Sequence, residues 1–203
     1  MDVRKNPING IKEVKPGSCV YVMDDIISDE LCDTLKIVID KTKLNKEEYT
    51  KTNNVLCESI SLLSIENKKF AKILDDELHQ CISDAGKRLL HFNKDIHNIG
   101  GDDGYAIRKI KGATRLHTDS VFQNAIENIP KNSHLVVRKL SLIIALNSDY
   151  EGGEFYFPSQ GIDKIKLKKG QAIFFPPYWT HPHGTRELNG TFRYTINTWL
   201  TEY

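Results

Sequence analysis

The sequence predicts a mainly β protein with flanking α-helices, in which a sandwich or barrel of short strands follows a helical N-terminal part. Two observations support this prediction. Before about residue 100 the apolar residues recur at helical spacing, and after it they recur with a period of two, between turns rich in Gly, Pro and Asn. A length of 203 residues suits one domain. We therefore expect a single domain, 1–203, in which about 1–99 form helical support and about 100–203 form the β core.

The first half of the chain predicts one strand and two helices. Residues 18–26 predict a short strand, and Ser28 can cap a helix that runs to about residue 41. Residues 42–55 are polar and predict a loop, and a longer helix is expected from about residue 66 to residue 90. Each helix has one apolar face, formed by Leu31, Leu35, Val38 and Ile39 in the first and by Phe70, Ile73, Leu74, Leu78, Ile82, Ala85 and Leu89 in the second.

The second half predicts strands separated by turns. The segment GGDDG (100–104) has the composition of a turn, and a strand is expected to follow Gly112. Further strands are predicted at 139–146, 165–167, 171–177 and 192–200, with a turn at Gly152-Gly153. Residues 120–137 interrupt the strands, and this segment is either a lid beside a site or a solvated surface loop.

Composition and charge limit the partners and the location. The net charge of +1 gives no overall electrostatic support for binding nucleic acid or an anionic membrane, so we expect neither partner. The four cysteines form no CxxC pair, which is typical of reduced thiols in the cytosol. No apolar run is long enough to act as a secretory signal or to cross a bilayer, so a cytoplasmic protein is expected.

Histidines and an aspartate occur near the expected strand ends. In the segment GATRLHTDS, His117 and Asp119 are two residues apart, which places both side chains on one face of an extended chain. About sixty residues later, HPHG supplies His181 and His183. Two histidines and one carboxylate are the ligand set that holds non-haem Fe(II) and leaves coordination positions open. The His-x-Asp pair alone is too common to decide, so the interpretation depends on the rest of the chain.

Polar residues alternate along the last predicted strand. Arg193, Thr195 and Asn197 face one side if Phe192, Tyr194 and Ile196 pack on the other. In a closed barrel the polar side is the interior, where a guanidinium needs an anionic partner and can hold a carboxylate through two parallel hydrogen bonds, with Thr195 adding a third. The alternation supports a solvent-facing Arg193 equally well.

In order and spacing, these motifs resemble those of the Fe(II)- and 2-oxoglutarate-dependent dioxygenases, and within them the prolyl-4-hydroxylase-like subgroup. The matching motifs are His117-Thr118-Asp119, the later ALNSDYEGGEFYF and GQAIFFPP, a distal histidine, and RYTINTW. The resemblance covers nearly the whole chain and is strongest over 105–200. It implies a cupin-like double-stranded β-helix, or jelly roll, with the N-terminal helices packed on it.

The resemblance also implies a site. His117, Asp119 and a distal histidine would bind Fe(II), and 2-oxoglutarate would bind the iron while its far carboxylate meets Arg193. Thr195 and Asn197 are the further candidates on that strand to contact the cosubstrate. Spacing within the subgroup favours His183 as the distal ligand, with His181 as the runner-up. Dioxygen is the oxidant, ascorbate is a candidate reductant, and 2-oxoglutarate is converted to succinate and CO2 while a C–H bond of the substrate is hydroxylated.

The chain departs from the subgroup near the cosubstrate. Many members have a tyrosine a few residues before His-x-Asp, where this chain has Lys109 and Ile110, and Tyr105 is the candidate replacement. Phe155 stands where a threonine is usual. The expected substrate is a prolyl or other amino-acid residue in a peptide or protein.

Three classes of alternative remain open. The chain could be a catalytically silent jelly-roll binding or sensor module, an oxygenase acting on a free amino acid or a nucleobase, or another cupin-type metalloenzyme. The sequence predicts neither the substrate-contacting residues nor the oligomeric state.

Overall fold

One large antiparallel sheet organises the protein. The structure is a computed structural model that describes residues 10–42, 45–47, 56–60, 62, 65–119 and 137–202. The strands of the large sheet run in the order β1-β2-β10-β6-β13-β5-β4-β3, and every neighbouring pair is antiparallel. Their bounds in that order are Ile11–Glu13, Tyr21–Met23, Ala172–Phe175, Val137–Ala145, Arg193–Glu202, Gly101–Lys111, Leu56–Ile60 and Asn45–Glu47.

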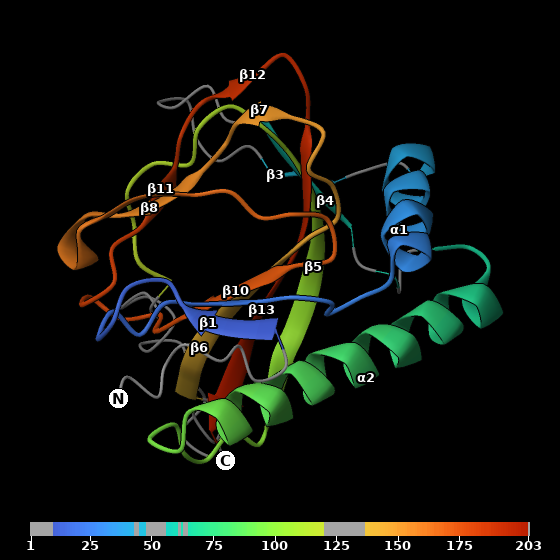
Figure 1. Cartoon of the computed structure of the whole chain (residues 1–203). Helices are drawn as coiled ribbons and strands as arrows, with labels where there is room; N and C mark the ends of the chain where they lie inside the picture. The colour runs from blue at the N-terminus through green and yellow to red at the C-terminus, as the bar shows by residue number, and fades with distance from the viewer. Residues whose placement is uncertain are drawn as a thin grey trace, which may run out of the picture.

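A second layer of short strands covers one face of this sheet (Figure 1). It consists of a three-stranded sheet, β11-β8-β9, and a two-stranded sheet, β12-β7. Apolar residues of both layers form a continuous core between them, including Ile143 and Ile173 from the large sheet and Phe155 and Phe157 from the small one. The bounds of the short strands are Gly184–Thr185 for β11, Phe155–Phe157 for β8, Ile162–Ile165 for β9, Leu188–Asn189 for β12 and Glu151–Gly152 for β7.

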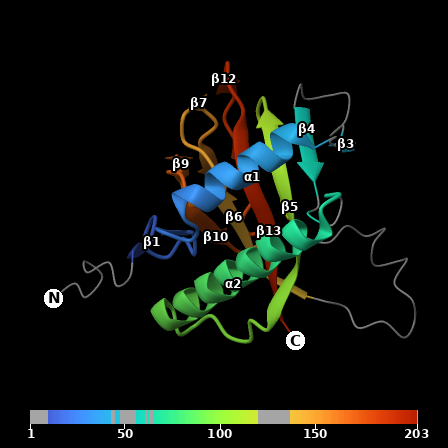
Figure 2. The ribbon, with the colours of Figure 1, turned by 90° about the vertical axis from the view of Figure 1, so that its right-hand side faces the viewer.

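Two helices cover the other face of the large sheet (Figure 2). Helix α1 spans Asp29–Lys41, and its N-terminus is capped because the Ser28 hydroxyl oxygen accepts a hydrogen bond from the Leu31 N–H at 3.1 Å. Helix α2 spans Lys68–Phe92. The sequence-based prediction of a mainly β protein with N-terminal helices packed on a jelly-roll core is confirmed, with both helices close to their expected bounds.

Several local predictions were wrong. The segment GGDDG is not a turn between elements, because β5 already begins at Gly101. Gly104, with φ +86°, lies within the strand at the point where the pairing of β5 with β13 shifts register. At the start of α2, Phe70 and Ile73 are 38% and 56% exposed, so the apolar stripe begins one turn later.

The N-terminal part also contributes more strands than expected. Residues before 99 supply β1, β3 and β4 in addition to the predicted β2, and all four extend the large sheet. Strand β3 lies within the expected loop 42–55. Of the candidate lid, residues 120–136 lie outside the described residues, and Val137 is already the first residue of β6.

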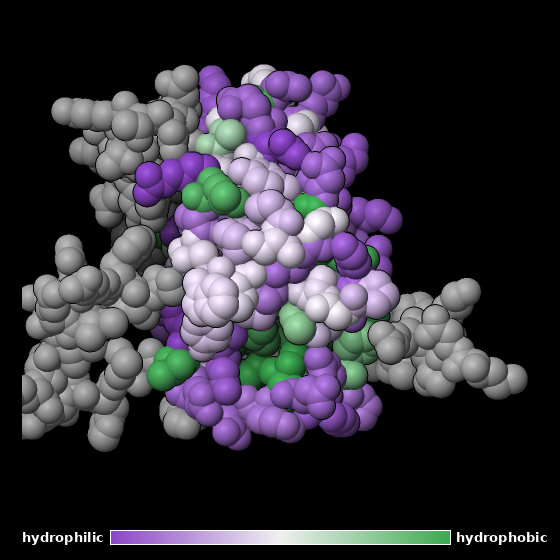
Figure 3. Space-filling model, turned by 90° about the vertical axis from the view of Figure 1, so that its left-hand side faces the viewer, coloured by the Kyte–Doolittle hydropathy of each residue, from purple (hydrophilic) through white to green (hydrophobic). Residues whose placement is uncertain are grey.

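The face opposite the helices is mainly polar. Figure 3 shows this side, where hydrophobic side chains appear in small separate groups among hydrophilic ones. No helix in the described part of the chain combines the length and the apolarity needed to cross a membrane.

Candidate active site

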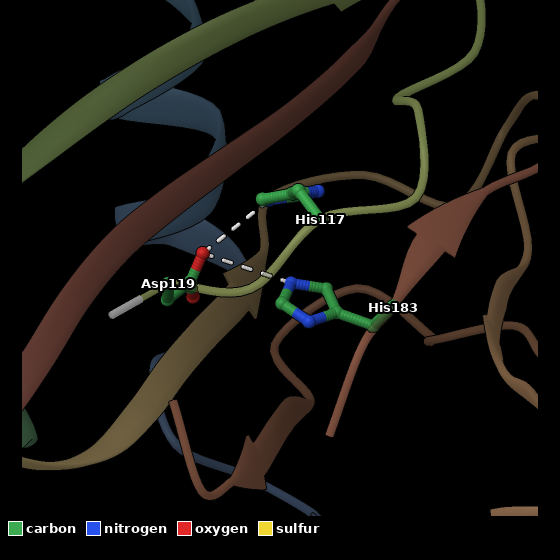
Figure 4. A group of neighbouring side chains, drawn as sticks. All are labelled: His117, Asp119 and His183. Carbon is green, nitrogen blue, oxygen red and sulfur yellow. Dashed lines mark ion pairs between the residues drawn. The ribbon is translucent and has the colours of Figure 1, made fainter. Parts of the chain in front are cut away.

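His117, Asp119 and His183 meet at one point between the two layers (Figure 4). Oδ1 of Asp119 lies 3.3 Å from Nε2 of His117 and 3.7 Å from Nε2 of His183. One donor atom from each of the three residues lies within 4.8 Å of the other two. The structure therefore brings together the three residues that the sequence predicts as metal ligands.

A backbone bridge holds the two histidines side by side. The N–H of each residue donates to the carbonyl oxygen of the other, at 2.9 Å for His117 and 2.8 Å for His183, in an isolated antiparallel bridge. The strand expected between Gly112 and His117 does not form: β5 ends at Lys111, and Gly112 turns the chain with φ +89°. The site depends on this bridge, which joins the segment after β5 to the segment before β11.

The other ring nitrogen of each histidine fixes the tautomer. Nδ1 of His117 donates to the carbonyl oxygen of Arg115 at 2.8 Å, and Nδ1 of His183 donates to that of His181 at 3.1 Å. Because a carbonyl oxygen can only accept, each Nδ1 carries a proton, and each Nε2 faces Asp119, where its lone pair would be available to a metal. Such hydrogen bonds are typical of histidines that bind metals.

Two donors hold the second oxygen of Asp119. Oδ2 accepts a hydrogen bond from the Ser141 hydroxyl at 2.6 Å and another from the indole N–H of Trp199 at 3.1 Å. Ser141 and Trp199 are directly opposite each other in the pairing of β6 with β13, so their side chains leave the sheet on the same face. The carboxylate is thereby oriented with Oδ1 free to face both imidazoles.

The electrostatics of the site favour a charged carboxylate beside basic rings. Burial opposes ionisation of Asp119, but the hydrogen bond and charge of His117, the charge of His183 and the hydrogen bond of the Ser141 hydroxyl hold the pKa of this carboxyl well below its usual range. Burial also opposes protonation of both histidines. It lowers the pKa of His183, whereas the bonds of His117 to Asp119 and to a backbone carbonyl outweigh burial and raise its pKa.

His181, the runner-up for the distal position, uses both ring nitrogens elsewhere. Its Nε2 donates to the Ser18 carbonyl oxygen at 2.9 Å, and its Nδ1 accepts from the Thr180 hydroxyl at the same distance. The ring thus ties the segment after β10 to the segment before β2, while its carbonyl oxygen orients His183. The structure places His183, and not the ring of His181, beside Asp119.

Arg193 lies in the same pocket as the three candidate ligands. The pocket has a volume of about 460 Å³, part of which is open to solvent. The Arg193 side chain is on the interior face of β13, with the residue 3% exposed, which decides between the two orientations that the alternation allowed. Its Nη1 donates to the Gly153 carbonyl oxygen at 2.7 Å, and its guanidinium carbon lies 5.1 Å from the centre of the Phe155 ring.

The other predicted cosubstrate residues divide between two faces. Thr195 and Asn197 line the pocket, and the Thr195 hydroxyl donates to Oδ1 of Asn197 at 2.7 Å. Tyr105 does not join them. It lies on the helix side of β5, where its hydroxyl donates to Oδ1 of Asp75 on α2 at 2.5 Å. The physical reason is the pleat of β5, which puts Tyr105 and Arg108 on opposite faces.

Several residues of the site were not predicted. Ser141 and Trp199 orient Asp119, and Arg108 of β5 lines the pocket. Trp199 follows Arg193 by an even number of residues, so the alternation that selected Arg193, Thr195 and Asn197 already indicated its face. No comparable signal in the sequence marked Ser141 or Arg108.

The donor set fits a divalent iron ion. Two donors bound to one ion at about 2.1 Å are roughly 3.0 Å apart at a right angle and at most about 4.2 Å apart. The two measured separations from Asp119 Oδ1, 3.3 and 3.7 Å, fall within this range. Two imidazoles and one carboxylate on one side of an ion are typical of non-haem Fe(II).

Comparison with known proteins shows which family the second half of the chain matches. The model of the 2OG-Fe(II) oxygenase superfamily matches residues 105–201, which include all the candidate ligands and Arg193. Prolyl 3-hydroxylase 1 from Rattus norvegicus and from Mus musculus are each 21% identical to this chain over 215 residues. The match covers 93% of this chain and 29% of the length of those relatives.

Solved structures with the same fold include two prolyl hydroxylases. A viral collagen prolyl hydroxylase from Paramecium Bursaria Chlorella virus-1, in complex with 2OG, has a TM-score of 0.64 at 20% identity over 94% of this chain and 100% of the other. A prolyl hydroxylase from Trichoplax adhaerens, in complex with a hypoxia inducible factor peptide fragment, has a TM-score of 0.61 at 12% identity, over 92% and 84% of the two chains. The assignment made from the sequence is confirmed for residues 105–201, which match the 2OG-Fe(II) oxygenase superfamily.

Proposed function

We propose that the chain is a single oxygenase domain in which His117, Asp119 and His183 hold Fe(II) and Arg193 binds 2-oxoglutarate. The reaction is the hydroxylation of a C–H bond, with release of succinate and CO2, and the substrate is a prolyl residue in a peptide or protein. The observation that carries this proposal is the convergence of three donor atoms on one point, within the segment that the family model matches. The match of residues 105–201 to the 2OG-Fe(II) oxygenase superfamily is the reason for expecting Fe(II), 2-oxoglutarate and dioxygen in the reaction.

The bound iron supplies the oxidising chemistry, and the side chains supply its geometry. The Nδ1 hydrogen bonds of His117 and His183 hold both rings with Nε2 toward the ion. Ser141 and Trp199 keep Oδ2 of Asp119 occupied, so the carboxylate offers one oxygen and leaves coordination positions for the cosubstrate and dioxygen.

Arg193 is suited to the far carboxylate of 2-oxoglutarate. Its guanidinium is buried in the pocket, and its contact with the Gly153 carbonyl oxygen fixes its direction. A fixed planar fork binds a carboxylate through two parallel hydrogen bonds, which a buried position strengthens. Thr195, two residues further along β13 and on the same face, would add a hydroxyl donor if its hydroxyl turned from Asn197 to the ligand.

The prolyl substrate is supported by the kinds of protein that resemble this chain. The curated relatives are prolyl 3-hydroxylases, and the structural neighbours include prolyl hydroxylases, one of them holding a peptide. A catalytically silent binding module is disfavoured because the ligand set and its supporting donors are all in place. A free amino acid or a nucleobase is the alternative substrate for the same oxygenase chemistry.

The test is formation of succinate that requires both Fe(II) and 2-oxoglutarate. The purified protein is reconstituted anaerobically with Fe(II), exposed to oxygen with 2-oxoglutarate and a panel of proline peptides, and assayed for succinate and for peptides heavier by one oxygen atom. Asp119→Ala is expected to reduce both products to background, whereas Asp84→Ala, which removes an exposed carboxylate from α2, is expected to leave them unchanged. Retention of the original rate by Asp119→Ala would refute the metal site.

A further inference from the structure

A second guanidinium, that of Arg108, lines the same pocket as Arg193. Arg108 is on β5, directly opposite Thr195 in the pairing of β5 with β13. Its Nε is buried without a hydrogen-bond partner, and no residue in the described part of the chain forms an ion pair with it. Arg108 as a whole is half-buried, and leaving its Nε out of water without a partner is costly, which indicates that a partner arrives with a ligand.

Other arginines of this protein are matched within the fold. Arg138 forms an ion pair with Asp103 at 2.8 Å, and Arg186 forms one with Asp163. Both of these ion pairs lie outside the pocket that contains Arg108, because none of the four residues lines it. Arg108 is therefore different in both respects: it faces the candidate active site, and no acidic side chain of the described residues compensates its charge.

A count of charges in the pocket shows which ligand is missing. The charged side chains that line it are Asp119, Arg193 and Arg108, with both histidines neutral when they bind a metal. Fe(II) and the dianion of 2-oxoglutarate cancel each other, and Asp119 cancels Arg193. The positive charge of Arg108 is left over once the metal and the cosubstrate of the proposed function are bound.

We propose that Arg108 binds a carboxylate of the substrate, so that the enzyme selects peptides with an acidic group close to the residue that is hydroxylated. This inference rests on the proposed function and adds a specificity-determining residue to it. The carboxylate belongs either to an Asp or Glu side chain or to the C-terminus of the peptide, since a guanidinium fork binds both in the same way.

The strand geometry gives the scale of the distance between the acidic group and the reacting residue. Trp199, whose indole holds Asp119, is four residues along β13 from Thr195, the residue opposite Arg108. At about 3.3 Å per residue this separation is roughly 13 Å, which an extended peptide covers in about four residues. The acidic group is therefore expected within about four residues of the hydroxylated one, on one side of it.

The experiment uses two matched series of proline peptides. In one series a single Asp or Glu is placed, in turn, at each of the four positions before and after the proline. In the other series Asn or Gln replaces that residue. A separate pair of peptides compares a free C-terminal carboxylate with a C-terminal amide. Binding to the domain loaded anaerobically with Fe(II) and 2-oxoglutarate is measured first, and kcat/KM second. Arg108→Gln is compared with Lys111→Gln, which removes a positive charge from an exposed position at the end of the same strand.

The wild-type protein is expected to prefer an acidic peptide over its amide counterpart by about 10- to 100-fold, the value of one charge-assisted hydrogen bond. Arg108→Gln is expected to abolish this preference, and Lys111→Gln to retain it. Which series shows the preference identifies a side-chain or a C-terminal carboxylate as the source.

Three results would overturn the inference. The first is equal treatment of acidic and amide peptides by the wild-type protein, and the second is a preference that survives in Arg108→Gln. The third is a loss of 2-oxoglutarate affinity in Arg108→Gln as large as that in Arg193→Gln, because both arginines would then serve the cosubstrate. All three are read on protein that binds Fe(II) and 2-oxoglutarate, so they are distinct from failure of the proposed function, in which neither binds or no succinate forms.

Discussion

Removing the Ser141 hydroxyl tests how much the orientation of Asp119 contributes to metal binding. Ser141 is 1% exposed, and its Oγ lies 2.6 Å from Oδ2 of the carboxylate. Replacement by alanine deletes this one donor and leaves the backbone pairing of β6 with β13 intact. Trp199 still donates to the same oxygen, so the carboxylate keeps one of its two supports.

The expected effect follows from the charge of the acceptor. A hydrogen bond to a charged group contributes about 1.5–3 kcal/mol, and about 1.4 kcal/mol corresponds to a tenfold change in affinity. Loss of one outer partner of a metal-ligating carboxylate therefore weakens metal binding by roughly 10- to 100-fold. Because Trp199 remains, we expect Ser141→Ala to fall near the lower end of that range.

The assay is an anaerobic titration of the purified protein with Fe(II), followed by calorimetry or by the absorbance of the complex with 2-oxoglutarate. Ser83→Ala, on the exposed side of α2, is the control for a serine-to-alanine change away from the site. Equal Fe(II) affinity in Ser141→Ala and in the wild-type protein would refute the argument that Oδ2 must be held for Oδ1 to bind the ion.

Three further predictions concern the fold. Gly152→Ala is expected to lower the free energy of unfolding by more than about 1 kcal/mol in a denaturant titration, because φ is +73° and a Cβ would lie 1.9 Å from the Glu187 carbonyl oxygen. Ser28→Ala removes the cap of α1 and is expected to cost about 1 kcal/mol in the same measurement. Burial raises the pKa of the Cys32 thiol to about 11, so roughly one molecule in a thousand carries this thiol as thiolate at pH 8. Iodoacetamide should therefore modify the exposed Cys19 of the folded protein well before Cys32, as measured by peptide mass spectrometry.

The parts of the fold that were predicted from the sequence are those with a local physical cause. Helix α1 was predicted because Ser28 supplies a cap and the apolar residues that follow fit a single helical face. The apolar face of α2 was extended too far toward its N-terminus because the exposed residues Phe70 and Ile73 continue the same spacing as the buried ones. The start of β5 was missed because GGDDG has the composition of a turn, whereas Gly104 serves a shift in register within the strand. Only the pairing with β13 distinguishes the two, and a sequence does not display strand pairing.

The site shows the same division. The His-x-Asp spacing and the position of Arg193 were readable because each depends on residues close together in the sequence. The role of Arg108 was not readable, because Lys109 follows it directly and the side chains of two adjacent strand residues face opposite ways. Either of these two cations could have faced the pocket. Lys109 turns to the helix side and pairs with Asp40 at 2.7 Å, and Arg108 is left in the pocket. The alternation shows which residues of a strand share a face, but it does not show which face of β5 lies on the pocket side of β13. For the same reason Tyr105 was assigned to the wrong face.

The register of β13 links the stability of the fold to the geometry of the site. This strand lies between β6 and β5, and its residues alternate between the pocket, which receives Arg193, and the helix-side core, which receives Ile196 and Leu200. A slip of one residue would bring Ile196 into the pocket and bury the Arg193 guanidinium among the apolar side chains that α1 and α2 cover. The cost of an unpaired charge in that core is several kcal/mol, so hydrophobic packing on one face enforces the position of the guanidinium on the other. A one-residue insertion within 193–199 should therefore impair folding and 2-oxoglutarate binding together, whereas the same insertion at Gly190, where no atom lies within 4 Å of an added Cβ, should leave both intact.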